Sequence, residues 1–218
     1  MISFDYFSNY IFPPCILGFG LVGNLLGFTV MQRPKMLEIG PRNTYKYLFS
    51  SDTIFLFQMI VTYLQLSFNI DPALNSNVIC KLLYYLNYSL ATVSSMQLVY
   101  ISIDRYVSIK FPALRYFLRK RNNQLIYFMF IFMFNLIYYL PVAYNYSLIV
   151  TNETLACTFN NQYSQDLISY MDLTNRNILP SMLIMLFSAL LGIEVIKQII
   201  AKLLASIFFS FILFKLFN

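Results

Sequence analysis

Few residues in this sequence could do chemistry, and three of them lie inside long apolar stretches. Asp52 is an acid deep within one stretch, and Asn24 and Ser94 are polar residues within two others. Carboxylate, amide and hydroxyl oxygens together suit a small hard cation or ordered water. The alternative is that Asp52 bonds to neighbouring helices and serves packing alone. An ionisable residue costs about 2.5 to 3.5 kcal/mol at such a depth in a membrane, so either role needs partners.

The sequence offers little for catalysis. It contains no His, and its three cysteines are Cys15, Cys80 and Cys157. Without imidazole there is no Ser-His or Cys-His pair, and three cysteines alone cannot supply a four-ligand zinc site. We therefore expect no enzyme, no cofactor and no metal beyond a small cation near Asp52.

The composition favours a membrane protein. Of the 218 residues, 59% are hydrophobic and only 11% are charged, whereas about a quarter of an average soluble chain is charged. The mean hydropathy is +0.63. Apolar runs of about 20 residues can cross a hydrocarbon core of about 30 Å as helices.

The fold class that follows is all-α, a multi-pass transmembrane helix bundle. Barrel strands are disfavoured because the apolar runs are apolar on all faces. Residues 203–214 form a 12-residue apolar run, shorter than a normal span, so 198–218 are expected to be an amphipathic or partial sixth-span stub. Five full spans are predicted at about 10–31, 47–68, 82–103, 125–144 and 177–196.

Basic residues indicate the orientation. They gather in the first and third gaps and after the fifth span, so those segments are expected in the cytoplasm and the N-terminus outside. The net charge of +6 does not indicate nucleic-acid binding, because the basic residues sit in short gaps between apolar runs. The residues concerned are Arg33, Lys35, Arg42, Lys46, Arg105, Lys110, Arg115, Arg119, Lys120, Arg121, Lys197 and Lys202.

The fourth gap, about 145–175, is expected to be a long outside loop. Asn145 and Asn152 each begin an N-glycosylation sequon there. The segments 146–151 and 154–159 could pair as a hairpin around the second sequon.

Several of these residues, in this order, resemble a rhodopsin-like G-protein-coupled receptor of the peptide-receptor kind. They are Gly23 with Asn24, Asp52, Cys80, and the run Asp104, Arg105, Tyr106, with Asn24 and Asp52 separated by 28 positions and Cys80 and Arg105 by 25. Ser94, Pro112, Pro141 and Pro180 agree with the same family. The resemblance covers about 10–197, and we expect 1–197 to form the receptor's transmembrane region.

The resemblance implies a role for each motif. Cys80 and Cys157 would form a disulfide that ties the outer loop to the third helix, and Cys15 would be a small buried side chain. Asp104 would pair with Arg105 in the resting receptor, and release of Arg105 together with Tyr106 and Pro112 would present a surface to the G protein. Asn24, Asp52 and Ser94 would form a sodium and water network that favours the inactive state.

The ligand end is less specified. Asn87, Tyr88 and Ala91 lie where the family binds small ligands and peptide tips, although Tyr88 could equally be ordinary packing. Amine receptors carry an Asp at the position of Asn87, so we favour a peptide. The expected partners are an extracellular ligand, a heterotrimeric G protein, membrane lipid and, in a dimer, another receptor.

The chain departs from the family after its fifth helix. Only 21 residues follow Lys197, and the family's Cys-Trp-x-Pro and Asn-Pro-x-x-Tyr motifs are absent. Phe132 and Ser188 stand where the family has Trp and Tyr. Three hypotheses remain: a plasma-membrane receptor that is incomplete as given, a truncated non-signalling receptor that is retained in the endoplasmic reticulum or dampens its relatives, and a small transporter coupled through Asp52.

Overall fold

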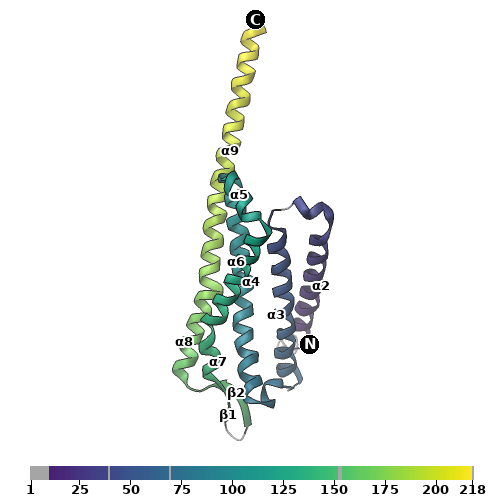
Figure 1. Cartoon of the computed structure of the whole chain (residues 1–218), viewed down its shortest axis with the longest axis vertical. Coiled ribbons are helices and arrows are strands. Elements are labelled where there is room, and N and C mark those ends of the chain that lie inside the picture. Colours follow the sequence, from purple (N-terminus) through teal and green to yellow (C-terminus); the bar gives the residue numbers. More distant parts are fainter. Residues whose placement is uncertain (1–9, 39, 69, 152–153, 218) are drawn as a thin grey trace, which may run out of the picture.

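The computed structural model describes residues 10–38, 40–68, 70–151 and 154–217. Long helices run side by side, and one of them extends well beyond the others (Figure 1). The helices are α2 (Phe12–Gln32), α3 (Arg42–Phe68), α4 (Asn77–Lys110), α5 (Pro112–Arg119), α6 (Arg121–Tyr138), α7 (Leu140–Asn145), α8 (Gln162–Asp172) and α9 (Leu179–Phe217). Short helical turns η2 (Pro34–Glu38), η3 (Pro72–Asn75) and η4 (Leu173–Ile178) connect several of them.

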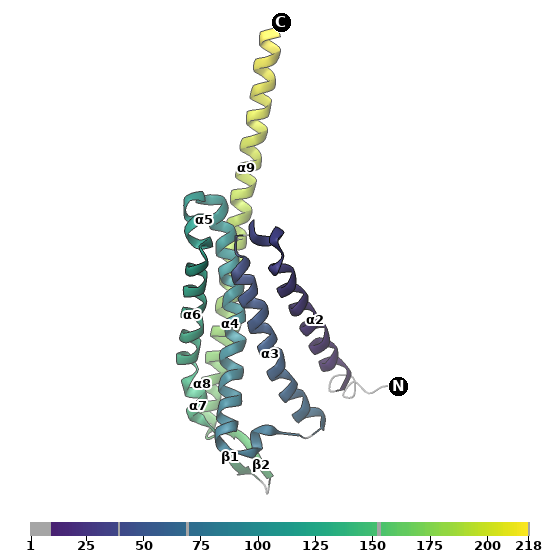
Figure 2. The same cartoon turned by 45° about the vertical axis from the view of Figure 1, so that its right-hand side comes forward.

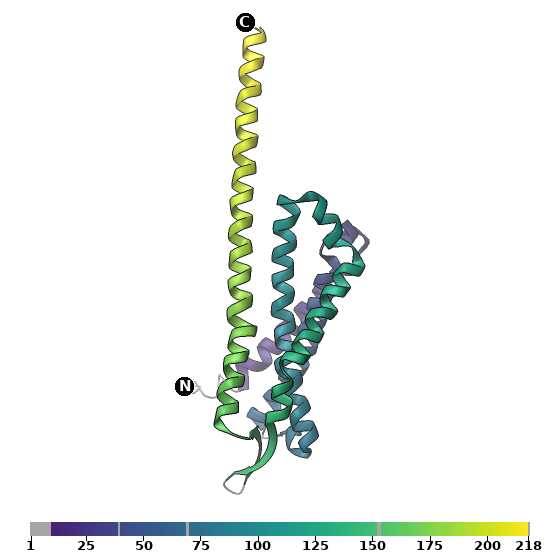
Figure 3. The same cartoon turned by 60° about the vertical axis from the view of Figure 1, so that its left-hand side comes forward.

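The predicted hairpin is confirmed. Strands β1 (Tyr146–Thr151) and β2 (Thr154–Phe159) pair antiparallel, with Tyr146 opposite Phe159 and Leu148 opposite Cys157. The hairpin lies at one end of the bundle, and we call this end the hairpin end (Figure 3). The opposite end carries α5 and is called here the Arg105 end.

Helix α4 is the centre of the bundle. It contacts α3, α5, α6, α7 and α9, whereas α2 packs on α3 at the edge (Figure 2). Helices α2, α3, α6 with α7, and α8 with α9 are long and apolar enough to cross a membrane, as judged on the described residues. Helix α4 is less apolar because its polar side chains, such as Thr92 and Gln97, face protein rather than lipid.

The fourth gap between long helices, predicted at about 145–175, is shorter in the structure. Helix α8 begins at Gln162, where Asn161 caps it by accepting a hydrogen bond from the Ser164 N–H at 2.7 Å. The π-helical turn η4 then joins α8 to α9. The fifth helix therefore starts about four turns earlier than the apolar run indicates, because its first turns are polar.

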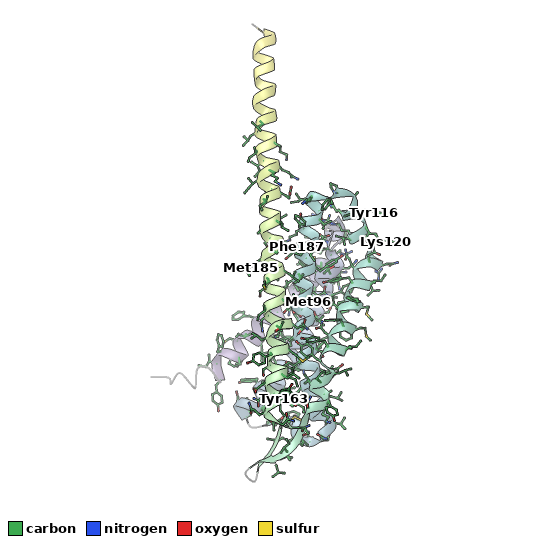
Figure 4. All side chains as sticks on the ribbon, turned by 90° about the vertical axis from the view of Figure 1, so that its left-hand side faces the viewer. Met96, Tyr116, Lys120, Tyr163, Met185 and Phe187 are labelled. Atoms are coloured by element: carbon green, nitrogen blue, oxygen red, sulfur yellow. A yellow bond between two sulfur atoms is a disulfide. The ribbon has the colours of Figure 1, made fainter. Side chains whose placement is uncertain are left out.

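The segment expected to form a partial sixth span does not separate from the fifth. Residues 198–217 continue α9 without a break, and α9 leaves the bundle beyond α5 (Figures 1 and 3). Within the bundle, α9 packs on α4 through Leu183 and Ile184, which contact the buried cluster of Met96, Val99 and Ile131. Phe187 lies on the side of α9 that faces the bundle, and Met185 lies on the other side (Figure 4).

Candidate functional site

The last turns of α4 bring Asp104 and Arg119 together. Asp104 is 1% exposed, and its Oδ2 lies 3.3 Å from Arg119 Nη2. Arg119 Nε reaches Asp104 Oδ1 at 3.4 Å, and Arg119 Nη2 also donates to Ser108 Oγ at 2.9 Å. A guanidinium presents its donors as a planar fork, so one arginine can face both oxygens of the buried carboxylate.

Two further contacts hold Arg119 in place. Gly40 packs against the guanidinium so closely that a Cβ at this position would overlap Arg119 Nε and Cζ. Gln124, 1% exposed, donates from Nε2 to the Gly40 carbonyl at 2.9 Å and to the Arg119 carbonyl at 3.2 Å. The connection before α3, the end of α5 and the start of α6 are therefore joined around one buried carboxylate.

This arrangement corrects the expected pairing of Asp104 with Arg105. Successive side chains on a helix point about 100° apart, so Asp104 faces α5 while Arg105 points outward. Arg105 is exposed, and its Nη2 donates to Tyr45 Oη at 3.1 Å. Sequence reasoning could not select Arg119, because the neighbouring basic residues Arg115, Lys120 and Arg121 look the same in the sequence.

The other two expected switch residues face different neighbours. Tyr106 packs its ring 5.9 Å from the ring of Phe187 on α9, and its hydroxyl accepts a hydrogen bond from Lys110 Nζ at 2.7 Å. Lys110 in turn lies 3.8 Å from Glu194 on α9. Pro112 is exposed at the first turn of α5, where a missing N–H costs little.

The polar residues at mid-depth lie between α3 and α4. Asp52 is half-buried and faces the Ser94 hydroxyl. Ser51 Oγ and Ser94 Oγ are 3.2 Å apart. These oxygens are the donor types that a sodium ion prefers, so the residues present fit such an ion.

Two glycines set the register that brings α2 to this site. A Cβ on Gly20 would lie 2.8 Å from Leu56 Cδ1, and a Cβ on Gly27 would lie 2.6 Å from Phe49 Cζ. The helices run antiparallel, so the same register places Asn24 opposite Asp52. Among the described residues, no hydrogen bond joins Asn24 to Asp52 or Ser94.

At the hairpin end, Cys80 and Cys157 form the disulfide that was expected. Cys80 is fully buried in a cluster with Ala73, Tyr139 and Tyr146. The rings of Tyr84 and Tyr146 stack at 4.2 Å, so α4 and β1 are joined by packing as well as by the covalent bond. Cys15, expected to be buried, is exposed on the outer face of α2.

The three expected ligand residues separate. Asn87 lines a small cleft between α3 and α4 with Gln58 and Gln65. Tyr88 packs its ring 5.8 Å from that of Tyr139, which agrees with a packing role, and Ala91 is 6% exposed within the helix contacts. Asn87 therefore borders a cleft at the hairpin end.

The two sequons also differ. Asn145 donates from Nδ2 to the Pro141 carbonyl at 2.9 Å, and its Oδ1 accepts from Ser164 Oγ at 2.8 Å. Its amide therefore helps to close the end of α7 onto α8. Asn152 lies outside the described residues.

A buried polar network, not predicted from the sequence, links α4, α6 and the residue after it, the end of α8, and η4. Tyr139 Oη lies 2.9 Å from Thr92 Oγ1 and donates to Asp172 Oδ1 at 3.2 Å. Asn175 Nδ2 donates to Asn135 Oδ1 at 3.1 Å, with both residues buried. The available signal was Asn135, an isolated amide in the apolar run 125–144.

The comparison with protein families gives a match over most of the chain. Residues 23–212 match the family described as 7 transmembrane receptor (rhodopsin family). No curated protein shows significant similarity to the chain. The matched residues include the Asp52 site, the disulfide and the Arg105 end. The chain therefore belongs to the rhodopsin family of seven-transmembrane receptors, which are membrane proteins and not enzymes.

Proposed function

We propose that the chain is a plasma-membrane receptor that transmits the binding of an extracellular ligand to a heterotrimeric G protein. In this proposal the hairpin end is outside and the Arg105 end is in the cytoplasm. The disulfide supports this orientation because disulfides persist in oxidising compartments. The basic residues around α5 support it as well, because positive charge favours the cytoplasmic side.

The observation that carries the proposal is the exposed Arg105 guanidinium. Asp104 is already paired with Arg119, so no carboxylate has to be displaced before Arg105 can contact a partner. Its hydrogen bond to Tyr45 is exposed and therefore weak. Leu114, 52% exposed on α5, and Pro112, also exposed, provide an apolar surface at the same end of the bundle.

The site around Asp52 offers a way to favour the inactive state of the receptor. A sodium ion held by Asp52 with Asn24, Ser51 and Ser94 would offset the cost of keeping a carboxylate in the membrane. Such an ion would stabilise the contact between α3 and α4 that is described above. A ligand that shifts α4 would then change the affinity of the ion, and the ion would change the affinity of the ligand by the same factor.

We favour a peptide as the ligand. The hairpin lies across the outer end of α4, and Asn87, below it, lacks the negative charge that would hold a small amine. An extended surface of strand and helix ends suits a peptide better than a small cation.

Binding of the G protein tests the proposal. The chain would be immobilised in lipid nanodiscs and incubated with purified heterotrimers from each of the main G-protein classes, after removal of bound nucleotide. The proposal predicts retention of at least one heterotrimer and its release by a non-hydrolysable GTP analogue. Equal retention on empty nanodiscs, or no effect of the GTP analogue, contradicts it.

A second candidate is a non-signalling partner of related receptors. The observation that favours it is the apolar surface of α9 near and beyond the end of the bundle, where Ile196, Ile200 and Leu204 are each more than half exposed. Energy transfer between this chain and a full-length rhodopsin-family receptor would test this candidate. This candidate predicts an energy-transfer signal that saturates as the amount of acceptor increases. The signal should fall when Ile196 and Ile200 are both replaced by Ala.

A further inference from the structure

Asp71, at the hairpin end, is a half-buried acid in no ion pair among the residues that the structure describes. It caps η3, where its Oδ1 accepts a hydrogen bond from the Ala73 N–H at 2.9 Å. Its Oδ2 accepts from Gln65 Nε2 at 2.8 Å. Both donors are neutral. They stabilise the Asp71 carboxylate by hydrogen bonding, but no described Lys or Arg is paired with its negative charge.

Two clefts meet at this carboxylate. The first lies between α3 and α4, has a volume of about 30 Å³, and is lined by Gln58, Thr62, Tyr84 and Asn87 among others. The second lies beneath β2, has a volume of about 300 Å³, and is lined by Leu74, Leu155, Ala156 and Cys157. Gln65 and Asp71 line both clefts, and neither lining contains a Lys or Arg.

The hairpin forms a fixed wall of the larger cleft. Cys157, in that wall, is bonded to Cys80 on α4. The Leu148 N–H also donates to Asn77 Oδ1 at 3.2 Å, which holds β1 at the start of α4. A group that enters beneath Leu155 therefore meets a preformed site, and less binding energy is lost to ordering the loop.

The hydrogen bonds of Asp71 also determine which cation fits. A carboxylate has about four acceptor sites on its two oxygens. One is used on each oxygen here, so each oxygen keeps an acceptor site. Two acceptors on one carboxylate match the paired N–H groups of a guanidinium better than a single ammonium group.

We propose that Asp71, at the junction of the two clefts, binds the guanidinium of an arginine side chain in the ligand. The proposal rests on the proposed function, in which the hairpin end receives a peptide. It narrows the ligand to a basic peptide. It also assigns the selectivity for that peptide to Asp71, which lies between α3 and α4. The smaller cleft, about the size of one water molecule, would hold an ordered water beside the guanidinium.

Thiol modification tests this site without knowledge of the natural ligand. Leu155, 45% exposed in the larger cleft, would be replaced by Cys in a Cys15→Ser background. The rates of reaction with a cationic and an anionic methanethiosulfonate would be measured in nanodiscs, with and without agmatine as the guanidinium probe. The proposal predicts faster reaction with the cationic reagent and slower reaction when agmatine is present.

Asp71→Asn is the decisive variant. It can keep the cap to Ala73 and the bond to Gln65, so the fold should survive. The rate with the cationic reagent should fall about fivefold, which is the effect of roughly 1 kcal/mol from a charge about 4 Å away in water. The rate with the anionic reagent should rise, and protection by agmatine should be lost. Asp71→Glu should partly restore the rate with the cationic reagent and the protection by agmatine. The matched control is Asp166→Asn, an exposed acid at the same end, which should leave both unchanged.

The results separate this site from the proposed function. If agmatine does not protect the wild-type cleft, or protects Asp71→Asn equally, the guanidinium site is wrong whatever the G-protein assay shows. If agmatine protects only when Asp71 is present but no G protein is retained, the site stands and the coupling is wrong. A changed melting temperature of Asp71→Asn without rescue by Glu would show a structural role and would also overturn the proposal.

Discussion

Arg119 places its guanidinium against both oxygens of the buried Asp104 carboxylate, with Nη2 3.3 Å from Oδ2. The partner of Asp104 therefore comes from α5 and not from the next residue of its own helix. This pairing fixes α5 against α4 and leaves Arg105 exposed at the end of the bundle.

Loss of Arg119 should destabilise the protein strongly. In Arg119→Gln the Asp104 carboxylate stays buried without a cation, which costs about 3 kcal/mol. The measurement is the free energy of unfolding in detergent, followed by circular dichroism. Arg115→Gln, an exposed arginine on the same helix, is the control and should change stability by less than about 0.5 kcal/mol. Equal effects of the two variants would show that the pair contributes nothing.

Gly40→Ala should also destabilise the protein strongly, in this case because its added Cβ displaces Arg119. The added Cβ would overlap the Arg119 guanidinium, so Arg119 must move away from Asp104. Gly192→Ala is the matched control, because no atom lies within 4 Å of a Cβ at that position of α9. It should be neutral or stabilising by about 0.5 to 1 kcal/mol, since Ala favours a helix more than Gly. A Gly40→Ala variant as stable as the control would contradict the packing of Gly40 on Arg119.

The fold could be predicted from the sequence further than the site could. Apolar runs locate the helices, and the segments 146–151 and 154–159 pair as expected. Helix α4 is recognisable by its length, although its hydropathy is reduced by side chains such as Gln97 that face other helices. The start of α8 could not be located from apolar residues, because a cap at Asn161 and a polar first turn determine it.

The site residues show why some contacts escape sequence reasoning. Cys80 and Cys157 form the expected bond, which the resemblance to the receptor family implies. The partner of Asp104 depends instead on how α5 turns back against α4. Arg115, Arg119, Lys120 and Arg121 look alike in the sequence, and the three-dimensional position of α5 alone brings Arg119 to the carboxylate.

Sodium should stabilise the protein through Asp52. The melting temperature should rise when sodium chloride replaces an equal concentration of choline chloride, because the ion binds the folded state alone. In Asp52→Asn this rise should be absent. Asp166→Asn, with the acid exposed on α8, should retain it. A rise in melting temperature with sodium that survives in Asp52→Asn would contradict sodium binding at Asp52.

Loss of the disulfide should destabilise the hairpin end. Cys157→Ser removes the bond to Cys80 and should lower stability by about 2 to 5 kcal/mol. Cys15→Ser, at an unpaired and exposed cysteine, should have little effect. Mass mapping under non-reducing conditions should also give a linked Cys80 and Cys157 peptide that reduction separates. Two free thiols in the folded protein would contradict the structure.

Arg105 is proposed to contact the G protein, and the rate of nucleotide exchange on the G protein measures whether it does. Wild type, Arg105→Ala and Arg33→Ala would be compared in nanodiscs with the heterotrimer that the binding assay selects. Arg33 is an exposed arginine next to the end of α2, so its replacement removes the same charge. If Arg105 contacts the G protein, exchange should exceed that on empty nanodiscs for wild type and Arg33→Ala, and should equal the empty-nanodisc rate for Arg105→Ala. Equal exchange by Arg105→Ala and wild type would contradict it.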